Sequence, residues 1–408
     1  SKNLFFGTDL DDKINAYFGN NLIIAGDGKN TIKTGAGDDV IFAHDGVNSI
    51  VGGLGNDTVS YELSDSAVYT SLEKGGINGI ATGDTYDGIE NLIGSKYDDV
   101  LEGDGVDNTI FGKDGNDILT GKDGSDTLDG GAGIDIASYE SSQNAVEINL
   151  GRNYAFGGEA TGDSFVNIEG IRGSVFGDAI IGDSNANIMY ANKGNDRIST
   201  EAGNDIVFAG DDDDYVRGDS GNDTLYGEKG NDVLIGGSGD DLLFGGEGKN
   251  IILGEDGKDI VVYKGISSDY EVMFFNNNTL LIKSKDGTIQ DTLKDIEEIA
   301  FDDALFEVDY ENRVLIKKAV FDGYDLDNTQ DSIQNTIDEN NNQAAAVATA
   351  IMIGTVAAAQ TEESSSDEIS YLSDDPASLD GLDNNTAILE SVVVPMLTVE
   401  HNYMRAYN

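Results

Sequence analysis

Residues 218–244 read GDSGNDTLY, GEKGNDVLI and GGSGDDLLF, which are three consecutive copies of one nine-residue pattern. Each copy has glycine at the first and fourth positions, aspartate at the sixth and leucine at the eighth. The same register extends in both directions, with six, five and ten copies in blocks at residues 7–60, 94–138 and 173–262, or 21 in all. A short period repeated this often is typical of a solenoid, in which each repeat packs on its neighbours.

Each position of the nonapeptide has a physical role. Glycine permits positive φ angles and close backbone approach, so a turn can aim several carbonyl oxygens at one point. Aspartate adds a hard anionic oxygen, and calcium takes six to eight oxygen ligands in irregular geometry. The eighth position is aliphatic or small apolar in every copy, which predicts a short strand whose middle side chain points into the core. The sixth position is Asp in 15 copies and Asn in six: Asn21, Asn30, Asn48, Asn108, Asn187 and Asn250.

We expect two nonapeptides to make one coil, so that copies n and n+2 stack on one edge and share calcium ions. The expected stacked pairs are Asp39 with Asp57, Asp99 with Asp117, Asp117 with Asp135, Asp196 with Asp214, Asp205 with Asp223, Asp214 with Asp232, Asp223 with Asp241, and Asp241 with Asp259. The sequence predicts about 10 to 15 calcium ions, with weaker sites where a carboxylate is missing. The predicted metal ligands are Asp12, Asp39, Asp57, Asp99, Asp117, Asp126, Asp135, Asp178, Asp196, Asp205, Asp214, Asp223, Asp232, Asp241 and Asp259.

The charge balance agrees with bound cations. The chain has 77 Asp and Glu against 24 Lys and Arg, a formal net charge of -53, which excludes nucleic acid as a partner. Without cations such a chain would be disordered by self-repulsion. A flexible glycine-rich linker is the first alternative, but linkers do not keep an aliphatic residue at a fixed position. A metal-free roll is the second, but one buried side chain per nine ordered residues is too little, so metal binding must supply folding energy.

The repeat resembles the RTX, or hemolysin-type, calcium-binding nonapeptide repeat family. The resemblance implies an all-β fold, a parallel β-roll bound to calcium, in an extracellular protein that a type I secretion machinery exports through an uncleaved carboxy-terminal signal. A cell-surface or matrix partner is a further expectation of this kind. The chain starts at Ser1 without a leader for the general secretory route, which fits a fragment or this other route. The longest apolar run, residues 344–359, is shorter than the roughly 20 residues of a membrane span.

The composition of the chain suggests seven segments. The two stretches between the blocks are copies of one another, since both open with Tyr-Glu and converge on ATGD and then Ile-Glu. Alternation of Val146, Ile148 and Leu150 predicts short strands packed beside the rolls as covers for their ends, with ligand binding as the alternative. The predicted segments are β-roll blocks at 1–60, 94–138 and 173–262, β inserts at 61–93 and 139–172, a β cap at 263–320, and at 321–408 a linker, an Ala-rich helix and the candidate secretion signal.

No catalytic motif stands out. Neither H-E-x-x-H nor G-x-S-x-G occurs, the only histidines are His44 and His401, and there is no Cys. The GDSG at residues 218–221 lies in repeat register, and Asp375-Pro376 has too little chain after it for the self-cleaving module that it faintly resembles. We therefore expect no enzyme activity. Two functions stay open: an extracellular structural, adhesive or carrier module, and the carboxy-terminal part of an RTX cytotoxin or exoenzyme whose active region precedes Ser1.

Overall fold

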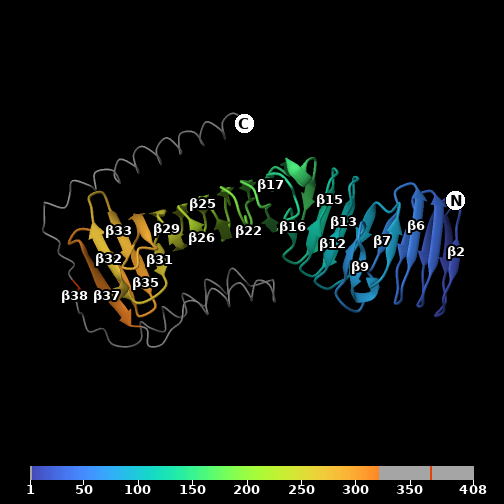
Figure 1. The fold of residues 1–408 in the computed structure, drawn as a ribbon, viewed down its shortest axis with the longest axis horizontal. Coiled ribbons are helices and arrows are strands. Elements are labelled where there is room, and N and C mark those ends of the chain that lie inside the picture. Colours follow the sequence, from blue (N-terminus) through green and yellow to red (C-terminus); the bar gives the residue numbers. More distant parts are fainter. Residues whose placement is uncertain (1, 321–367, 370–408) are drawn as a thin grey trace.

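The last three residues of each nonapeptide lie in a strand, and in several copies that strand continues into the first three residues of the next nonapeptide. The computed structural model describes residues 2–320 and 368–369, and in it the chain winds as an elongated parallel β-solenoid (Figure 1). Strands 18 residues apart pair in parallel, with Val207 opposite Leu225 and Leu225 opposite Leu243. Two nonapeptides therefore make one coil, and the expected all-β parallel roll is confirmed. The helix expected within residues 321–408 lies outside the described residues.

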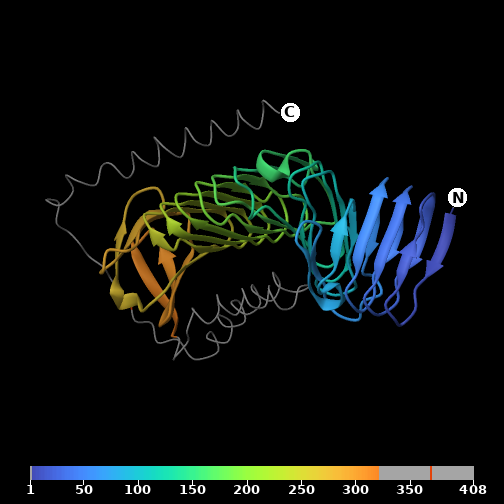
Figure 2. The same ribbon diagram turned by 45° about the vertical axis from the view of Figure 1, so that its right-hand side comes forward.

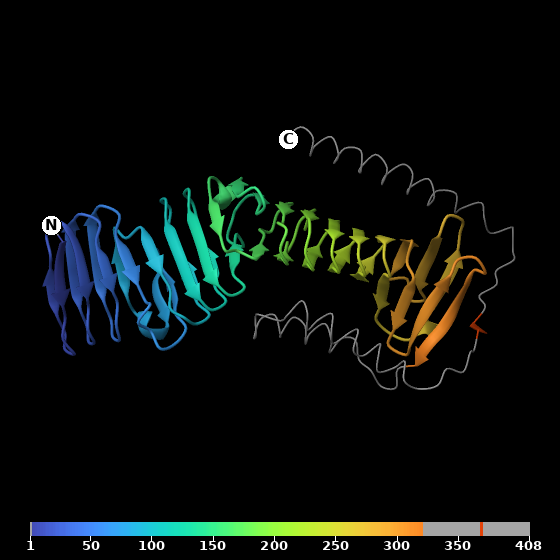
Figure 3. The same cartoon turned by 180° about the vertical axis from the view of Figure 1, so that it is seen from behind.

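The coils build four sheets, which we call A to D. Their strands follow one another along the rod in chain order (Figure 3), and they alternate between sheets A and B in block one, A and C in block two, and C and D in block three. Sheet A contains β1 (Lys2–Phe6), β3 (Asn20–Ile24), β5 (Val40–Phe42), β7 (Thr58–Ser60), β11 (Asn91–Ile93), β13 (Thr109–Asp114), β15 (Thr127–Ala132) and β19 (Ser164–Val166). Sheet B contains β2 (Lys13–Asn15), β4 (Thr31–Ala36), β6 (Ser49–Leu54) and β10 (Thr85–Asp87).

Sheets C and D complete the rod. Sheet C runs in the order β9 (Gly75–Asn78), β8 (Tyr69–Ser71), β12 (Val100–Glu102), β14 (Ile118–Thr120), β16 (Ile136–Ser138), β20 (Gly170–Arg172), β22 (Ile188–Tyr190), β24 (Ile206–Asp211), β26 (Thr224–Gly230), β28 (Leu242–Phe244), β31 (Ile260–Tyr263), β35 (Glu298–Phe301), β36 (Ala304–Asp309), β37 (Val314–Val320) and β38 (Glu368–Ile369), with β29 (Glu247–Gly248) beside β26. Sheet D contains β18 (Tyr154–Phe156), β17 (Glu147–Asn149), β21 (Ala179–Ile181), β23 (Arg197–Ser199), β25 (Tyr215–Ser220), β27 (Val233–Ser238), β30 (Ile251–Asp256), β34 (Gln290–Lys294), β33 (Thr279–Ser284) and β32 (Tyr270–Phe274).

The inserts join the sheets of the roll, which differs from the expectation that they pack beside it. In the first insert, β10 is the last strand of sheet B, β8 and β9 start sheet C, and β11 continues sheet A between β7 and β13. In the second, β19 is the last strand of sheet A, β17 and β18 start sheet D, and β20 continues sheet C. Each insert thus replaces one face of the solenoid while the other face runs on, and Figure 2 shows the rod as continuous.

The core is a single file of eighth-position side chains. From Ile23 to Val261 each of them is at most 1% exposed, and only Ile14, in the first coil, is partly buried. Buried aliphatic contacts between adjacent coils stabilise the stack, because they remove apolar surface from water. The single small residue at this position, Ala137, is also fully buried.

Block three carries a second apolar row on the outer face of sheet C. The rings of Tyr190, Phe208, Tyr226 and Phe244, at the ninth position of alternate copies, stack with centroids 5.1, 4.8 and 4.3 Å apart. Parallel pairing at 18-residue spacing places these rings in register, so the stack follows from the repeat itself.

Helical structure is limited to three single turns of 3-10 helix in the described part of the chain: η1 (Gly79–Ala81), η2 (Gly158–Ala160) and η3 (Ser267–Asp269). None of the helices described here has the length and apolar character that crossing a membrane requires.

Candidate metal centres

The sixth-position side chains line the turns at the edges of the solenoid, one above another. Oδ1 of Asp214 accepts a hydrogen bond from the backbone N–H of Asp196 at 2.8 Å, and Oδ1 of Asp241 accepts one from Asp223 at 2.8 Å. The same bond, 18 residues along the chain, is present in all eight predicted Asp pairs. Each pair is therefore stacked as expected, and one oxygen of the later carboxylate is fixed by the backbone.

The second carboxylate oxygen is buried and has no hydrogen-bond donor in most of these turns. Leaving a buried charged oxygen without a partner is unfavourable, so it points to a cation that the turn is built to hold. Among the described residues, Oδ2 is in this state in twelve of the 15 predicted ligands: Asp39, Asp57, Asp117, Asp126, Asp135, Asp196, Asp205, Asp214, Asp223, Asp232, Asp241 and Asp259.

The surrounding oxygens fit calcium. A Cβ placed on Gly218, the first residue of its copy, would lie 2.3 Å from Oδ2 of Asp223 and 2.6 Å from the carbonyl oxygen of Gly236. A carboxylate and a carbonyl of the next coil therefore converge on one small volume beside Gly218. Hard oxygen ligands that converge from two adjacent turns are the donor set that calcium prefers. We call these twelve carboxylates, whose Oδ2 has no hydrogen-bond donor, open; they would supply the anionic ligands of calcium.

Burial raises the pKa values of these carboxyl groups above the ordinary 3.8, because removal from water destabilises the charged form relative to the protonated form. Neighbouring carboxylates raise them further in most cases, and the backbone hydrogen bonds lower them. The pKa is raised to about 8 for Asp117, Asp126, Asp196, Asp223 and Asp232. It is raised to about 7 for Asp135, Asp214, Asp241 and Asp259, and to about 6 for Asp57 and Asp205. A bound cation would favour the charged form instead.

The first Asp of each block differs from the other predicted ligands. Oδ2 of Asp178 accepts the N–H of Ser174 at 2.6 Å, and its Oδ1 accepts the Ser174 hydroxyl at 2.8 Å and the N–H of Val146 at 2.7 Å. Both oxygens are thus satisfied by the chain, and the assignment of these residues as metal ligands stays a prediction. The same holds for Asp99 with Ser95 and Val68, and for Oδ2 of Asp12 with the N–H and hydroxyl of Thr8.

Five of the six sixth-position Asn side chains donate to nearby oxygens, whereas Nδ2 of Asn250 is buried without an acceptor among the described residues. The side-chain amide of Asn30 donates to the carbonyl of Gly26 at 3.1 Å and to Oδ1 of Asn48 at 2.9 Å. These bonds occupy carbonyl and side-chain oxygens that an Asp turn leaves available to a cation. The amides of Asn21, Asn48, Asn108 and Asn187 likewise donate to backbone carbonyls, of Gly19, His44, Glu90 and Glu169 respectively.

The inserts contribute carboxylates to the same columns. Oδ1 of Asp163 accepts the N–H of Asp126 at 2.8 Å, its Oδ2 accepts the Tyr139 hydroxyl at 2.8 Å, and Oε2 of Glu169 accepts the N–H of Asp135 at 2.9 Å. The same three bonds join Asp84 to Asn48 and Tyr61, with Glu90 to Asp57, and join Asp291 to Asn250 and Tyr263, with Glu297 to Asp259.

Sequence reasoning missed these Tyr, Asp and Glu residues, and it missed that residues 263–301 are a third copy of the insert. Two signals were available. A tyrosine directly follows the last nonapeptide of every block, at positions 61, 139 and 263. The insert Asp is followed by Glu exactly six residues later in all three places, at 84 and 90, 163 and 169, and 291 and 297.

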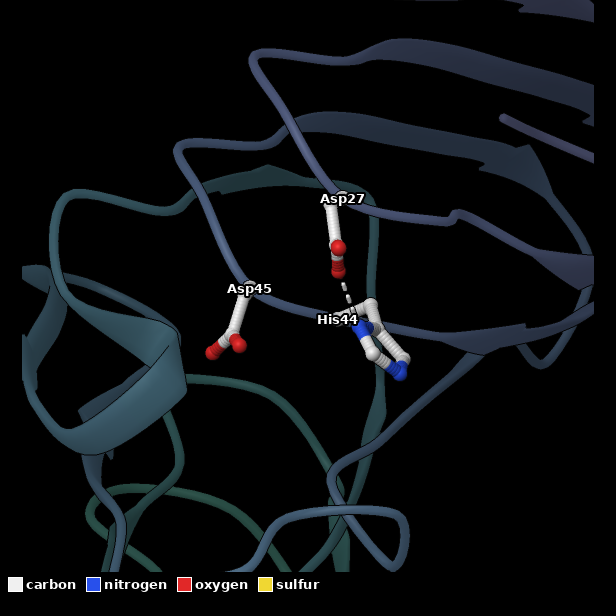
Figure 4. Close-up of side chains that lie close together, drawn as sticks. All are labelled: Asp27, His44 and Asp45. Carbon is white, nitrogen blue, oxygen red and sulfur yellow. Dashed lines mark hydrogen bonds and ion pairs between the residues drawn. The ribbon is translucent and has the colours of Figure 1, made fainter. Parts of the chain in front are cut away.

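A different group of ligating side chains lies on the edge of block one. His44 Nδ1 lies 2.5 Å from Oδ1 of Asp27, and Asp45 faces both residues from the next turn position, all ligating atoms lying within 4.8 Å of one another (Figure 4). These side chains are partly or fully exposed. The contact satisfies His44 as a hydrogen bond or ion pair to Asp27 without a metal.

Comparison with known proteins agrees with the repeat. A family model described as the RTX calcium-binding nonapeptide repeat, in four copies, matches residues 6–33, 24–59, 84–107, 102–137, 173–207, 181–216, 208–243 and 235–263. Two of these segments begin or end inside the inserts, at residues 84 and 263. No curated protein sequence matches the chain.

Two solved structures are similar to parts of the chain. One is the extracellular lipase LipA from Serratia marcescens, at 15% identity over 48% of this chain and 38% of the lipase chain, with a TM-score of 0.18. The chain thus spans well under half of that lipase. The other is a hyperactive, Ca2+-dependent, β-helical antifreeze protein from an Antarctic bacterium, at 16% identity over 72% of this chain and 94% of that one, with a TM-score of 0.17.

Proposed function

Because its three repeat blocks belong to the RTX calcium-binding nonapeptide repeat family, we propose that this chain is an extracellular β-roll module that folds when it binds calcium. The observation that carries the proposal is the set of twelve buried Asp oxygens without a hydrogen-bond donor. One cation for each open carboxylate gives a calcium load inside the predicted range of about 10 to 15 ions.

Calcium supplies what the folded chain lacks without it. The roll stacks Asp223 between Asp205 and Asp241, and all three carboxylates are buried. Without a cation these groups must either stay charged in a desolvated column or take up protons, and both alternatives oppose folding at neutral pH. Bound calcium removes this cost and offsets part of the net charge of -53.

This coupling suits export in the unfolded state. Bacterial cytosol holds calcium far below the affinity expected of such extracellular sites, so the acidic chain stays unfolded there and can be threaded through a type I secretion channel. Outside the cell, calcium near the millimolar range folds it. The proposed partners are therefore calcium ions and the type I secretion machinery, and the proposed location is extracellular.

The role that we propose for the folded module is structural, adhesive or as a carrier, without catalysis. Its repeated carboxylates are placed as metal ligands, spaced by the coil, and not as an acid and base pair across a cleft. A rigid rod with a long acidic edge can hold other surfaces apart or contact a cell-surface or matrix partner through calcium.

Circular dichroism of the full chain, with and without calcium, tests the proposal. In chelator we expect a mostly unfolded spectrum, and calcium in the high micromolar to millimolar range should restore the β signal. Magnesium at the same concentration is the control and should not, because it demands small octahedral sites and keeps its waters. A fully folded spectrum in chelator would overturn the proposal.

A further inference from the structure

The three inserts share a Tyr–Asp pair at the end of a column of sixth-position side chains. We propose that Asp84, Asp163 and Asp291 are metal-free column ends, in which the hydroxyl of Tyr61, Tyr139 or Tyr263 takes the place of a calcium ion. The inference rests on the proposed calcium binding and adds to it a rule for where the columns that contain Asp126 and Asp232 stop binding ions.

The insert Asp is equivalent to a repeat Asp in its backbone contact. Oδ1 of Asp126 accepts the N–H of Asn108 at 2.7 Å, and Oδ1 of Asp163 accepts the N–H of Asp126 at 2.8 Å, so Asp163 is the next member of the same column. The strands confirm the register, because Leu128 lies opposite Phe165. Asp126 and Asp163 thus make the same backbone contact and differ in what meets the second oxygen.

That second oxygen is open in Asp126 and closed in Asp163. Tyr139 is fully buried and its hydroxyl donates to Oδ2 of Asp163 at 2.8 Å, whereas Oδ2 of Asp126 has no donor among the described residues. Burial beside carboxylates holds the pKa of the Tyr139 hydroxyl well above its ordinary value, so the hydroxyl keeps its proton and stays a donor. A neutral donor in a dry site satisfies the carboxylate as a cation would, without adding charge.

The segment that carries Asp163 also differs from a regular calcium turn. Asp126 ends the turn 121–126 between β14 and β15, whose first glycine lies beside Oδ2 of Asp126. Asp163 instead follows the 3-10 turn η2, and its backbone N–H donates to the carbonyl of Ala160 at 3.3 Å. Asp84 follows η1 in the same way and donates to the carbonyl of Ala81 at 2.8 Å, whereas Asp291 lies within strand β34, which pairs antiparallel with β33. The carbonyls of Ala81 and Ala160 are therefore already hydrogen-bonded within the insert.

The column on the opposite edge passes through the same insert. Oε2 of Glu169 accepts the N–H of Asp135, and Asn187 then donates its side-chain amide to the Glu169 carbonyl before the Asp column resumes at Asp205. One insert therefore ends one column and interrupts the other. The same places are where sheets B, A and D have their last parallel strands: β10 and β19 begin directly after Asp84 and Asp163, and β34 contains Asp291.

A matched pair of substitutions in the full chain tests the inference. Asp126→Asn and Asp163→Asn are the same chemical change in adjacent members of one column, and bound calcium is measured by atomic emission after equilibrium dialysis. Asp126→Asn should lose at least one ion. Asp163→Asn should bind as many as the unchanged chain, because the amide oxygen still accepts from Asp126 and the amide nitrogen can donate to the Tyr139 oxygen.

The outcomes separate this inference from the proposed function. Loss of calcium in Asp163→Asn as large as in Asp126→Asn would overturn the column ends while leaving calcium binding intact. An unchanged chain that binds no calcium would overturn the proposed function. If either variant does not fold, Asp232→Asn and Asp291→Asn form a second pair in another column, with an open carboxylate at 232 and the Tyr263 hydroxyl at 291, and the same two results decide.

Discussion

The backbone N–H of Asp214 donates to Oδ1 of Asp232 at 3.0 Å, while Oδ2 of Asp232 is buried without a hydrogen-bond donor. One carboxylate thus has two roles: its Oδ1 accepts a hydrogen bond from the adjacent coil, and its Oδ2 is an anionic ligand available to a cation. The hydrogen bond forms without metal, whereas Oδ2 has no partner unless a cation binds. Substitutions that keep the first and remove the second should therefore isolate the contribution of calcium.

Asn at two consecutive members of the densest column should remove calcium without removing the coil contacts. In Asp214→Asn combined with Asp232→Asn, the amide oxygen can still accept the backbone N–H, but the charged oxygen is lost from two stacked turns. We expect about two ions fewer and a higher calcium midpoint of folding. Equilibrium dialysis and calcium titration followed by circular dichroism measure both. Asn21→Ala with Asn30→Ala is the control, and an equal effect there would mean that the sixth-position carboxylate does not set affinity.

The reverse substitution should create sites in block one. Asn30 and Asn48 are stacked, and their amides donate to Oδ1 of Asn48 and the carbonyl of His44. Asn30→Asp with Asn48→Asp removes these donors and places two carboxylates in one column. The variant should be less stable than the parent in chelator and should bind more calcium than the parent in excess calcium. Unchanged stoichiometry would show that this edge of block one lacks the other oxygen ligands.

The core and the columns could be predicted because each depends on a single repeated position. Burial of Leu225 and stacking of Asp223 on Asp241 follow from the period of nine and the two-copy coil. The carboxylates whose oxygens are all hydrogen-bonded could not be predicted this way. Oδ1 of Asp178, for example, accepts the backbone N–H of Val146, a residue of the preceding insert 32 positions away. The nine-residue period predicts which residues are neighbours within a block, but it does not predict contacts between a block and an adjacent insert.

The third insert copy was missed for a related reason. Residues 263–290 form the antiparallel pair β32 and β33 where the earlier inserts have shorter strands, so similarity along the chain is lost. The three copies share the residues that make the hydrogen bonds at the end of the column: a Tyr directly after the block, and an Asp followed six residues later by a Glu. These residues occur where a column ends and are not part of the nine-residue repeat. Their role can be recognised only from the hydrogen bonds that they make in the folded chain.

Acid should partly replace calcium. The pKa values of Asp223 and Asp232 are raised to about 8 in the folded chain, above the ordinary 3.8, so the calcium-free folded state binds protons more tightly than the unfolded state. Its stability is therefore lowest above about pH 8, and it rises as pH falls toward about pH 4, where both states are protonated. In chelator, the β signal and the melting temperature should increase between about pH 8 and about pH 5. A decrease over this range would contradict burial of these carboxyl groups.

Adding a methyl group beside an open carboxylate tests how tightly its turn is packed. In Gly218→Ala the new methyl group would lie 2.3 Å from Oδ2 of Asp223 and 2.6 Å from the Gly236 carbonyl oxygen. The turn must therefore shift toward the arrangement of the copies that have Ala191 or Ala209 at this position beside open carboxylates. We expect a higher calcium midpoint without loss of the site, and a free energy of unfolding reduced by about 1–3 kcal/mol in calcium. Gly105→Ala is the matched control, because nothing lies within 4 Å of a Cβ there, and it should change stability by less than about 0.5 kcal/mol. Equal effects would mean that Gly218 matters for its backbone and not for the space it leaves.

The last prediction concerns export. If residues 321–408 contain the secretion signal, fusing them to an unrelated, slow-folding passenger should export that passenger from a cell with a type I exporter, and the passenger alone should stay inside. Slow folding is needed because a folded passenger would block a narrow channel whatever signal it carried. A fusion to residues 173–320, which supply a block and its closing insert without the tail, is the control and should not be exported. Export by the control alone would place the signal in the roll. Full chain found folded in the cytosol would contradict the calcium switch itself, because the open carboxylates would then have been satisfied before the chain reached calcium.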